Sequence, residues 1–518
     1  PLLVQQTLFP CESRDLLLVG GQVKVSDLSD VGLRQRGHQE VDGVGLMSPI
    51  SKAAVLIDRP MPGDEIGRII GAGSSGRPGP VFMEFCLDVQ AKNFKPTMPS
   101  IQAETSNPIK PAADEVEEVK RLIHCASRPV ILVGSGLHRQ KFRDLFPKLE
   151  QLGIPLMTTW NAADYVDATS QHYVGRPNIW GQRSANVLIQ QADLILAVGT
   201  RLGLQQTGFK WEAFGPLAKI VHIDIDRAEL DKGHPASDLQ IQCDAFEFLA
   251  QLVEAEHSGR TWRDWADFCR QVRTLLPNSE PVNSAPAPFV SPFALAEWFN
   301  ESLDDLDVVM PSSSGGSFTS IMQVFEPRGE QRLITNKGLA SMGYGLAGAI
   351  GAALVGGRRV ILTEGDGGFA QNLQELGTLS QLELPVKIFL QSNDGYATIR
   401  GTQKNYFDGT WIGCDSATGL GLPAWDLICA AFAIPHMVVT SENLGSDDVD
   451  RALRSNRPYF FEVLVDPNQG YLPKVGASIG PDGKITSDPL HLMKPSLDPQ
   501  LAKKVMQYLE EGRKRESH

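Results

Sequence analysis

The stretch Val360-Ile-Leu-Thr-Glu-Gly-Asp-Gly-Gly-Phe-Ala-Gln-Asn-Leu-Gln-Glu-Leu-Gly-Thr-Leu379, continued by Val386-Lys-Ile-Phe-Leu-Gln-Ser-Asn-Asp-Gly395, decides the fold. An apolar strand at 360–362 leads into a glycine turn, an amphipathic helix follows, and a second apolar strand ends at Ser392-Asn393. The apolar face of the predicted helix consists of Phe369, Leu373, Leu376 and Leu379. This order of elements predicts a βαβ unit with parallel strands.

The two strand ends of this unit carry polar residues suited to a metal site. Asp366 and Asn393 lie 27 residues apart, about one crossover, so both are expected at the carboxyl edge of the sheet. Mg²⁺ prefers hard oxygen ligands, and the carbonyl of Gly395 is a third candidate. Gly365, Gly367 and Gly368 would let backbone N–H groups approach a diphosphate at a helix N-terminus. The alternative is a Gly-Asp-Gly turn whose aspartate only caps a helix.

Similar units extend outward along almost the whole chain. Short apolar runs that end in Gly or Asp alternate with helical patterns, as expected for central parallel strands. The runs begin at Leu16, Pro129, Asp193, Lys219, Arg359, Val386 and Tyr459. The sequence therefore predicts an α/β protein with three doubly wound parallel-sheet domains, the first of them incomplete.

Two segments rich in proline and small polar residues, 93–112 and 277–292, separate these regions. They predict a partial domain at 1–95, a central domain at 110–276, a third domain at 288–470 and a polar tail at 471–518.

Composition excludes some classes of function. A formal net charge of −13 argues against a nucleic-acid partner, and no run of about 18 apolar residues suggests a membrane span. The cysteines never form a C-x-x-C pair, so we expect buried free thiols and a reducing compartment. The expected location is cytoplasmic, with an organellar location as the alternative. They are Cys11, Cys86, Cys125, Cys243, Cys269, Cys414 and Cys429.

The Gly-Asp-Gly…Asn pattern resembles the signature of thiamine-diphosphate enzymes, and Gln374-Glu-Leu-Gly-Thr and Leu384-Pro-Val-Lys resemble their acetolactate synthase branch. In that family a bulky residue before the signature props the cofactor into its V shape, and Met342 matches it. The resemblance also implies that the loop Ser312-Ser-Ser-Gly-Gly-Ser317 holds the diphosphate, through Gly315, Gly316 and Ser317. The dinucleotide-like spacing of Gly343, Gly345 and Gly348 has no strand before it, and we interpret it as close helix packing.

The central region, 113–275, resembles the domain that binds FAD in acetolactate synthases. The implied flavin residues are Gly134, Arg201, Thr207, Gly208 and Asp226. Related decarboxylases keep this domain without flavin, so retained FAD and a domain without FAD both stay open.

Residues 15–92 resemble the second half of the pyrimidine-binding domain. Gln39 would lie near the substrate pocket, and Lys52 matches a lysine often found after this segment or is a solvated surface lysine. The family's activating glutamate belongs to the first half, and no residue in 1–14 fits it. We therefore expect either a fragment or a replaced N-terminus.

The resemblance implies decarboxylation of a 2-oxo acid such as pyruvate, with ThDP and Mg²⁺, and addition of the remaining two carbons to a second carbonyl. Three alternatives remain open at this point: transfer to a keto-sugar, simple 2-oxo-acid decarboxylation, and a non-catalytic ThDP- or FAD-binding protein. Family members form active sites between subunits, so a homodimer or homotetramer is expected.

Overall fold

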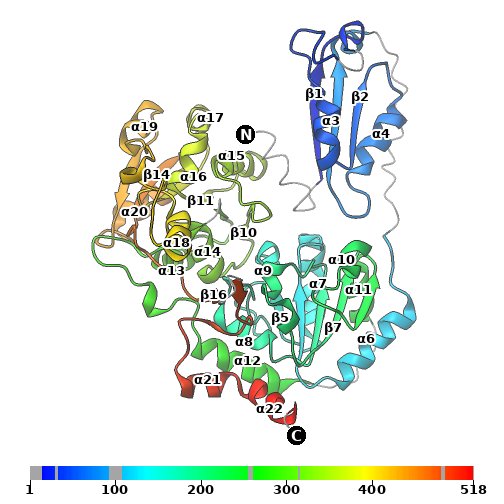
Figure 1. Ribbon diagram of the computed structural model, residues 1–518, viewed down its shortest axis with the longest axis vertical. Coiled ribbons are helices and arrows are strands. Elements are labelled where there is room, and N and C mark those ends of the chain that lie inside the picture. The colour runs from blue at the N-terminus through cyan, green and yellow to red at the C-terminus, as the bar shows by residue number, and fades with distance from the viewer. Residues whose placement is uncertain are drawn as a thin grey trace. The chain divides into compact units, whose positions relative to one another are not determined.

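The computed structural model describes residues 15–29, 33–92, 108–254, 261–312, 315–479 and 485–516. The chain folds into two compact units, 1–109 and 110–518 (Figure 1). Within the described ranges, no helix is long and apolar enough to cross a membrane.

The N-terminal unit contains a parallel sheet in the order β1-β3-β2. Its strands are β1 (Leu16–Gln22), β2 (Ala53–Ile57) and β3 (Pro80–Cys86), and α4 (Gly63–Ala72) joins β2 to β3. Leu17 and Val19 on β1 are 43% and 67% exposed, so the described residues leave one face of this edge strand uncovered. Faces of parallel sheets are usually covered.

The second unit begins with a five-stranded parallel sheet in the order β5-β4-β6-β7-β8. Its strands are β4 (Pro129–Val133), β5 (Leu156–Thr158), β6 (Leu194–Val198), β7 (Lys219–Asp224) and β8 (Leu239–Gln242). The helices around it include α6 (Ala113–Cys125), α7 (Arg139–Glu150), α8 (Arg183–Ile189), α11 (Ala245–Glu254) and α12 (Arg263–Leu275). Strands β4 and β6 are buried at every position, which explains their continuous apolar sequence.

A six-stranded parallel sheet follows in the order β10-β9-β11-β12-β14-β13. Its strands are β9 (Val308–Pro311), β10 (Arg332–Leu333), β11 (Val360–Gly365), β12 (Val386–Ser392), β13 (His436–Val439) and β14 (Tyr459–Leu464). One face packs on α13 (Pro292–Ser302), α14 (Gly316–Val324) and α20 (Asp447–Leu453). The other face packs on α15 (Tyr344–Gly356), α17 (Glu375–Gln381) and α19 (Trp425–Ala431). The α/β class with parallel sheets is confirmed.

Buried polar contacts join the two sheets of the second unit and hold α14 in place. The Arg176 guanidinium, with no exposed surface, donates to the carbonyl oxygens of Met322 at 3.2 Å and Phe325 at 2.6 Å. Gln182 donates to the Gln323 carbonyl at 2.9 Å. Since an unpaired buried charge is costly, these contacts fix the helix that begins at Gly316.

The segment predicted as a polar C-terminal tail, 471–518, packs on the central sheet domain where the structure describes it. Leu490 and Val505 are buried in the core of the central sheet domain, and Tyr508 packs on Trp265 of α12. Tyr508 belongs to α22 (Gln507–Glu516), which is labelled at the C-terminal end of the chain in Figure 1. The Gln191 side chain donates to the Val505 carbonyl at 2.8 Å and accepts from the Tyr508 amide at 3.1 Å. A few apolar residues, widely spaced among polar ones, are enough to dock the segment.

The cysteine prediction was correct in part. Among the described residues all cysteines are free thiols, and five are buried, but Cys125 at the end of α6 is exposed. Cys11 lies outside the described residues.

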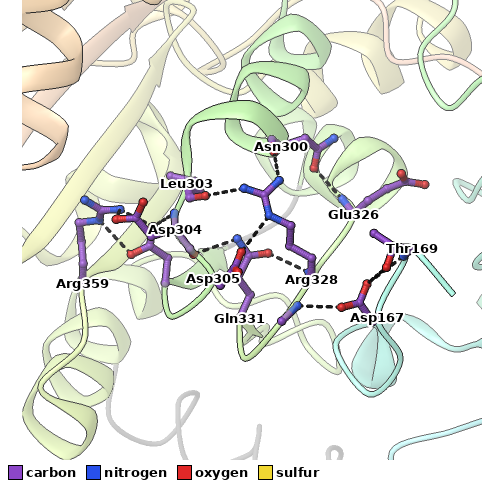
Figure 2. Close-up of polar contacts among 12 residues, drawn as sticks. Asp167, Thr169, Asn300, Leu303, Asp304, Asp305, Glu326, Arg328, Gln331 and Arg359 are labelled. Carbon is purple, nitrogen blue, oxygen red and sulfur yellow. Dashed lines mark hydrogen bonds and ion pairs between the residues drawn. The ribbon is translucent and has the colours of Figure 1, made fainter. Parts of the chain in front are cut away.

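Arg328 ties the end of α13 to the turn before β10. Figure 2 shows its guanidinium donating to the Asn300 carbonyl at 2.5 Å and the Leu303 carbonyl at 2.8 Å. The adjacent Gly329 amide donates to Asp167 of the central domain at 2.9 Å. These carbonyls lie at the C-terminus of a helix, where a cation is favourable.

We expect Arg328→Met to lower the free energy of unfolding by about 1–3 kcal/mol, because two carbonyls lose a charged donor. Arg451→Met is the matched control, since Arg451 forms only an exposed pair with Asp448. The control should change stability by less than about 0.5 kcal/mol. Urea unfolding of both variants measures the difference, and equal losses would refute the role of Arg328.

Lys387 on β12 has no exposed surface, and its ammonium donates to Ser455 Oγ at 2.7 Å and to the Arg457 carbonyl. Burial lowers the pKa of this ammonium from 10.5 to about 7. Between these values the unfolded chain holds more protons than the folded chain, so stability rises with pH across this window.

Lys387→Met should remove this dependence. The stability of the variant relative to wild type should fall as pH rises from about 7 to 10, by at most about 1.4 kcal/mol per pH unit. Unfolding curves of both proteins at several pH values provide the measurement. A difference that does not change with pH would contradict the prediction.

Candidate functional site

Three loops meet at the carboxyl edge of the six-stranded sheet. Strand β11 lies between β9 and β12, so the residues that follow these three strands come together. The connection after β9 runs through α14 on one face of the sheet, and the connection after β11 runs through α17 on the other. This change of face is a topological switch point, where open α/β sheets bind ligands.

Asp366, with no exposed surface, is the centre of this edge. Its carboxylate accepts from the backbone amides of Gly367 at 2.7 Å, Asn393 at 3.0 Å and Gly395 at 3.0 Å. Burial raises the pKa of this carboxyl to about 6, and the three amide donors oppose the rise. A buried carboxylate with this pKa is suited to hold a cation that replaces its lost hydration.

The Asn393 side chain faces two oxygen atoms. One terminal atom of its amide lies 3.3 Å from Asp366 Oδ1 and 2.8 Å from the Gly395 carbonyl oxygen. Either the amide nitrogen donates to both, or the amide oxygen joins them around a cation. Neighbouring ligands of octahedral Mg²⁺, bound at 2.0–2.1 Å, are about 2.9 Å apart, so the three groups have suitable spacing.

The three predicted metal ligands, Asp366, Asn393 and Gly395, thus lie together. In the described ranges no group of three or more His, Cys, Asp or Glu side chains could hold a metal. The mixed carboxylate, amide and carbonyl set at this sheet edge is a candidate metal site.

Arg400 and Tyr471 hold this loop, and sequence reasoning missed both. The buried Arg400 guanidinium donates to the carbonyls of Asn393 at 2.8 Å and Asp394 at 2.6 Å. The Tyr471 hydroxyl hydrogen-bonds the Asn393 side chain, and burial raises its pKa. Arg400 directly follows the loop in the stretch Gly395-Tyr-Ala-Thr-Ile-Arg400, whereas no local pattern connects Tyr471 with it.

The loop at 312–317 approaches the same edge, although residues 313 and 314 lie outside the described residues. Gly315 has φ +102°, which favours glycine. A Cβ on Gly316 would lie 1.8 Å from the Tyr471 ring. The Ser317 carbonyl accepts from the Thr363 hydroxyl at 3.3 Å. The predicted diphosphate loop is therefore packed against both Tyr471 and β11.

The helix expected after the Gly-Asp-Gly turn is broken. It consists of α16 (Asp366–Phe369), a 3₁₀ turn (Ala370–Asn372) and α17, although its predicted apolar face is largely buried. The Gly367 amide is bonded to Asp366, and a Cβ on Gly367 would lie 2.4 Å from the Tyr396 ring. Glycine is therefore required at position 367 by its close packing against Tyr396. Its amide, which the sequence predicted to approach a diphosphate together with those of Gly365 and Gly368, instead donates to Asp366.

Met342 is 39% exposed, and its sulfur accepts from Gln371 at 3.6 Å. The interpretation of the neighbouring glycines as packing residues is confirmed. A Cβ on Gly345 would lie 2.2 Å from Glu364 Oε2, and one on Gly348 would lie 2.3 Å from Met310. Helix α15 therefore lies directly against β9 and β11.

The predicted flavin residues follow three neighbouring strands of the central sheet. Gly134 follows β4, Arg201 follows β6 and Asp226 follows β7, so they share one sheet edge. Arg201 pairs with Glu229 at 3.7 Å, and Asp226 caps α10 (Arg227–Asp231) by accepting from Ala228. Thr207 donates to the Gly203 carbonyl, and Gly208 lies near Leu490. The polar groups of this set are already engaged within the chain.

In the N-terminal unit, Gln39 is exposed and has φ +65°. Lys52 is exposed and donates to the carbonyls of Ser75 and Arg77, both at 3.1 Å, so it clamps the turn before β3. Sequence reasoning missed Glu84, which is 4% exposed on β3, with its pKa raised by burial. An acid inside the apolar run Pro80-Val-Phe-Met-Glu-Phe-Cys86 is the signal that could have found it.

Comparison with known proteins agrees with this geometry. Residues 116–252 match the family model for the central domain of thiamine pyrophosphate enzymes, and residues 314–463 match that for their C-terminal TPP-binding domain. Together the two matches span more than half of the chain, and they confirm the resemblance found in the sequence.

Similar relatives are named as acetolactate synthases. The isozyme 2 large subunit of Escherichia coli (strain K12) is 29% identical over 450 residues, which cover 85% of this chain and 78% of the relative. The isozyme 1 large subunit of the same organism is 29% identical over 90% of this chain and 80% of its own length. The large subunit from Parasynechococcus marenigrum (strain WH8102) is 29% identical over 84% of this chain and 71% of its own length.

Proposed function

We propose, since this chain belongs to the family of thiamine pyrophosphate enzymes, that it binds thiamine diphosphate with Mg²⁺ and decarboxylates a 2-oxo acid. Pyruvate is the expected substrate, and a second carbonyl compound accepts the two carbons that remain, as the names of its relatives suggest. The observation that carries the proposal is the convergence of Asp366, Asn393 and the Gly395 carbonyl at the switch point.

Each loop at this edge has a proposed task. Asp366, Asn393 and Gly395 would hold Mg²⁺, and the backbone at Gly315, Gly316 and Ser317 would hold the diphosphate. When bound, thiamine diphosphate supplies the carbon nucleophile that makes decarboxylation possible.

The chain contributes position and electrostatics. The Asp366 carboxylate must be ionised to bind a cation, and at neutral pH it is, because its pKa is about 6. Arg400 donates to the carbonyls of Asn393 and Asp394 and so positions the metal loop. Met342 would support the V shape of the cofactor, as the family resemblance implies. We assign no residue to the activation of the cofactor's ring.

FAD in the central domain is a further proposal from the same resemblance. The shared sheet edge of Gly134, Arg201 and Asp226 supports it, whereas the internal pairing of Arg201 and Asp226 opposes it. We therefore assign no catalytic step to a flavin. The visible absorption spectrum of the chain, after incubation with FAD and gel filtration, tests whether flavin is retained.

A homodimer or homotetramer is the proposed assembly. Exposed apolar residues gather on α18 (Ala397–Tyr406) and just after it, and such patches mark interaction surfaces. They are Ile399, Tyr406, Phe407, Trp411 and Ile412. Light scattering of the purified chain should give a mass of at least two copies.

The activity is tested by incubating the full chain with pyruvate, thiamine diphosphate, Mg²⁺ and FAD. Pyruvate consumption, release of CO₂ and formation of acetolactate are expected, and omission of Mg²⁺ should abolish all three. A folded chain that binds the cofactor but releases no CO₂ would refute the catalytic part of the proposal.

A further inference from the structure

Lys337 lies in the segment between β10 and α15, where it contacts aromatic faces instead of a carboxylate. Its ammonium lies 4.7 Å from the ring centroid of Phe318 and 5.5 Å from that of Trp160. No described carboxylate forms an ion pair with it, and burial lowers its pKa to about 8. Cation–π contacts retain the charge without neutralising it, so the ammonium is still available to an anion.

Trp160 supplies a second donor at the same place. Its side chain comes from the turn after β5 in the central domain, and the residue is 3% exposed. The indole Nε1–H has no hydrogen-bond partner, although its ring packs on Phe318 at 5.4 Å. Buried donors are nearly always satisfied, so an unsatisfied one beside an unpaired ammonium indicates a missing acceptor.

The geometry of the two donors restricts the ligand. The ammonium lies over the face of the indole ring, whereas the N–H bond lies in the plane of that ring. The two donors therefore point in different directions, and an anion with two or more acceptor oxygens can offer a separate oxygen to each. Carboxylates and phosphates meet this condition.

The location connects these donors with the proposed active site. Phe318 directly follows Ser317 of the proposed diphosphate loop, and Met342 follows Lys337 in the same segment. In the proposed function Asp366, Asn393 and Gly395 hold Mg²⁺ and the loop at 315–317 holds the diphosphate, so Lys337 and Trp160 are left for another anion.

We propose that Lys337 and Trp160 form an anion subsite that binds the carboxylate of the 2-oxo acid. The assignment of this carboxylate rests on the proposed function, whereas the anion subsite itself rests on the two donors. A diphosphate offers the same oxygen chemistry, and the experiment separates the two sources.

Calorimetric titration of the full chain, without thiamine diphosphate, tests the subsite with two probes, pyruvate and inorganic pyrophosphate. Lys337→Met removes the charge, and Trp160→Phe removes the N–H but retains an aromatic face. Lys141→Met is the matched control, because the Lys141 ammonium also lies 5.5 Å over a ring, that of Phe246 on α11. Thermal unfolding shows whether each variant is folded.

We expect pyruvate to bind about tenfold or more weakly to Lys337→Met and several-fold more weakly to Trp160→Phe, with no change in the control. Weaker binding of pyrophosphate alone would keep the anion subsite but assign it to a cofactor. Wild-type chain that binds neither probe, or a folded Lys337→Met that binds both as wild type does, would overturn the proposal. Thiamine diphosphate and Mg²⁺ are titrated in a separate experiment. If the proposed function is wrong, that titration shows no binding, whereas the pyruvate and pyrophosphate titrations still report on the subsite.

Discussion

Asp366→Asn should abolish Mg²⁺-dependent binding of thiamine diphosphate, with a rise of at least about 100-fold in the dissociation constant. The carboxylate is the only charged group among the three proposed ligands, and it is fully buried. Asparagine keeps the shape but removes the charge. In the wild-type chain the backbone N–H groups of Gly367, Asn393 and Gly395 donate to this carboxylate. The asparagine amide nitrogen cannot accept from them, so the variant also loses part of these hydrogen bonds.

Asp394→Asn is the matched control for this variant. Asp394 belongs to the same loop and has φ +61°, a conformation that asparagine tolerates. Its carboxylate accepts from Ser416 instead of facing Asn393. Calorimetry with and without Mg²⁺ should show nearly unchanged binding for Asp394→Asn. If folded Asp366→Asn bound the cofactor with the Mg²⁺ dependence of wild type, the metal site would lie elsewhere.

Gly395→Ala should both destabilise the chain and remove the metal site. Gly395 has φ +110°, and a Cβ there would lie 2.4 Å from the Cys414 carbonyl oxygen and 2.7 Å from Leu420. Backbone strain and overlap together should lower the free energy of unfolding by about 2–4 kcal/mol. The Gly395 amide and carbonyl both point into the site, so any shift of the loop also weakens Mg²⁺ binding.

Gly401→Ala provides the comparison. Gly401 lies within α18, and a Cβ there would meet no atom within 4 Å. Alanine should stabilise this helix by about 0.5–1 kcal/mol. Thermal unfolding and Mg²⁺ titration of both variants provide the readout. A Gly395→Ala chain as stable as Gly401→Ala, with the same affinity for Mg²⁺, would show that the loop is not constrained as described.

Local sequence patterns were enough to predict the sheets and the centre of the site. Continuous apolar runs such as 129–133 and 360–362 are buried strands because both faces of a parallel sheet are covered. The handedness of a single crossover was enough to place Asp366 beside Asn393. Both inferences need only neighbouring residues and general rules of chain geometry.

Contacts between distant segments could not be predicted. Tyr471 reaches Gly316 and Asn393 from beyond β14, and no periodicity connects these positions. The break after Phe369 likewise depends on tertiary contacts, such as the Asn372 side chain donating to the Gly343 carbonyl at 2.9 Å. The 471–518 segment packs on the central domain through single apolar residues, Leu490 and Val505. The composition of the segment as a whole is polar, so it does not predict these contacts.

The measurement that tests the central claim most directly is calorimetric titration of thiamine diphosphate into the full chain, once with Mg²⁺ and once with EDTA. We expect saturable binding at one site per chain with Mg²⁺ and none with EDTA, because the diphosphate would be held through the cation at Asp366, Asn393 and Gly395. Equal binding in both titrations, or none from a folded chain with Mg²⁺, would contradict the assignment of this sheet edge as the cofactor site.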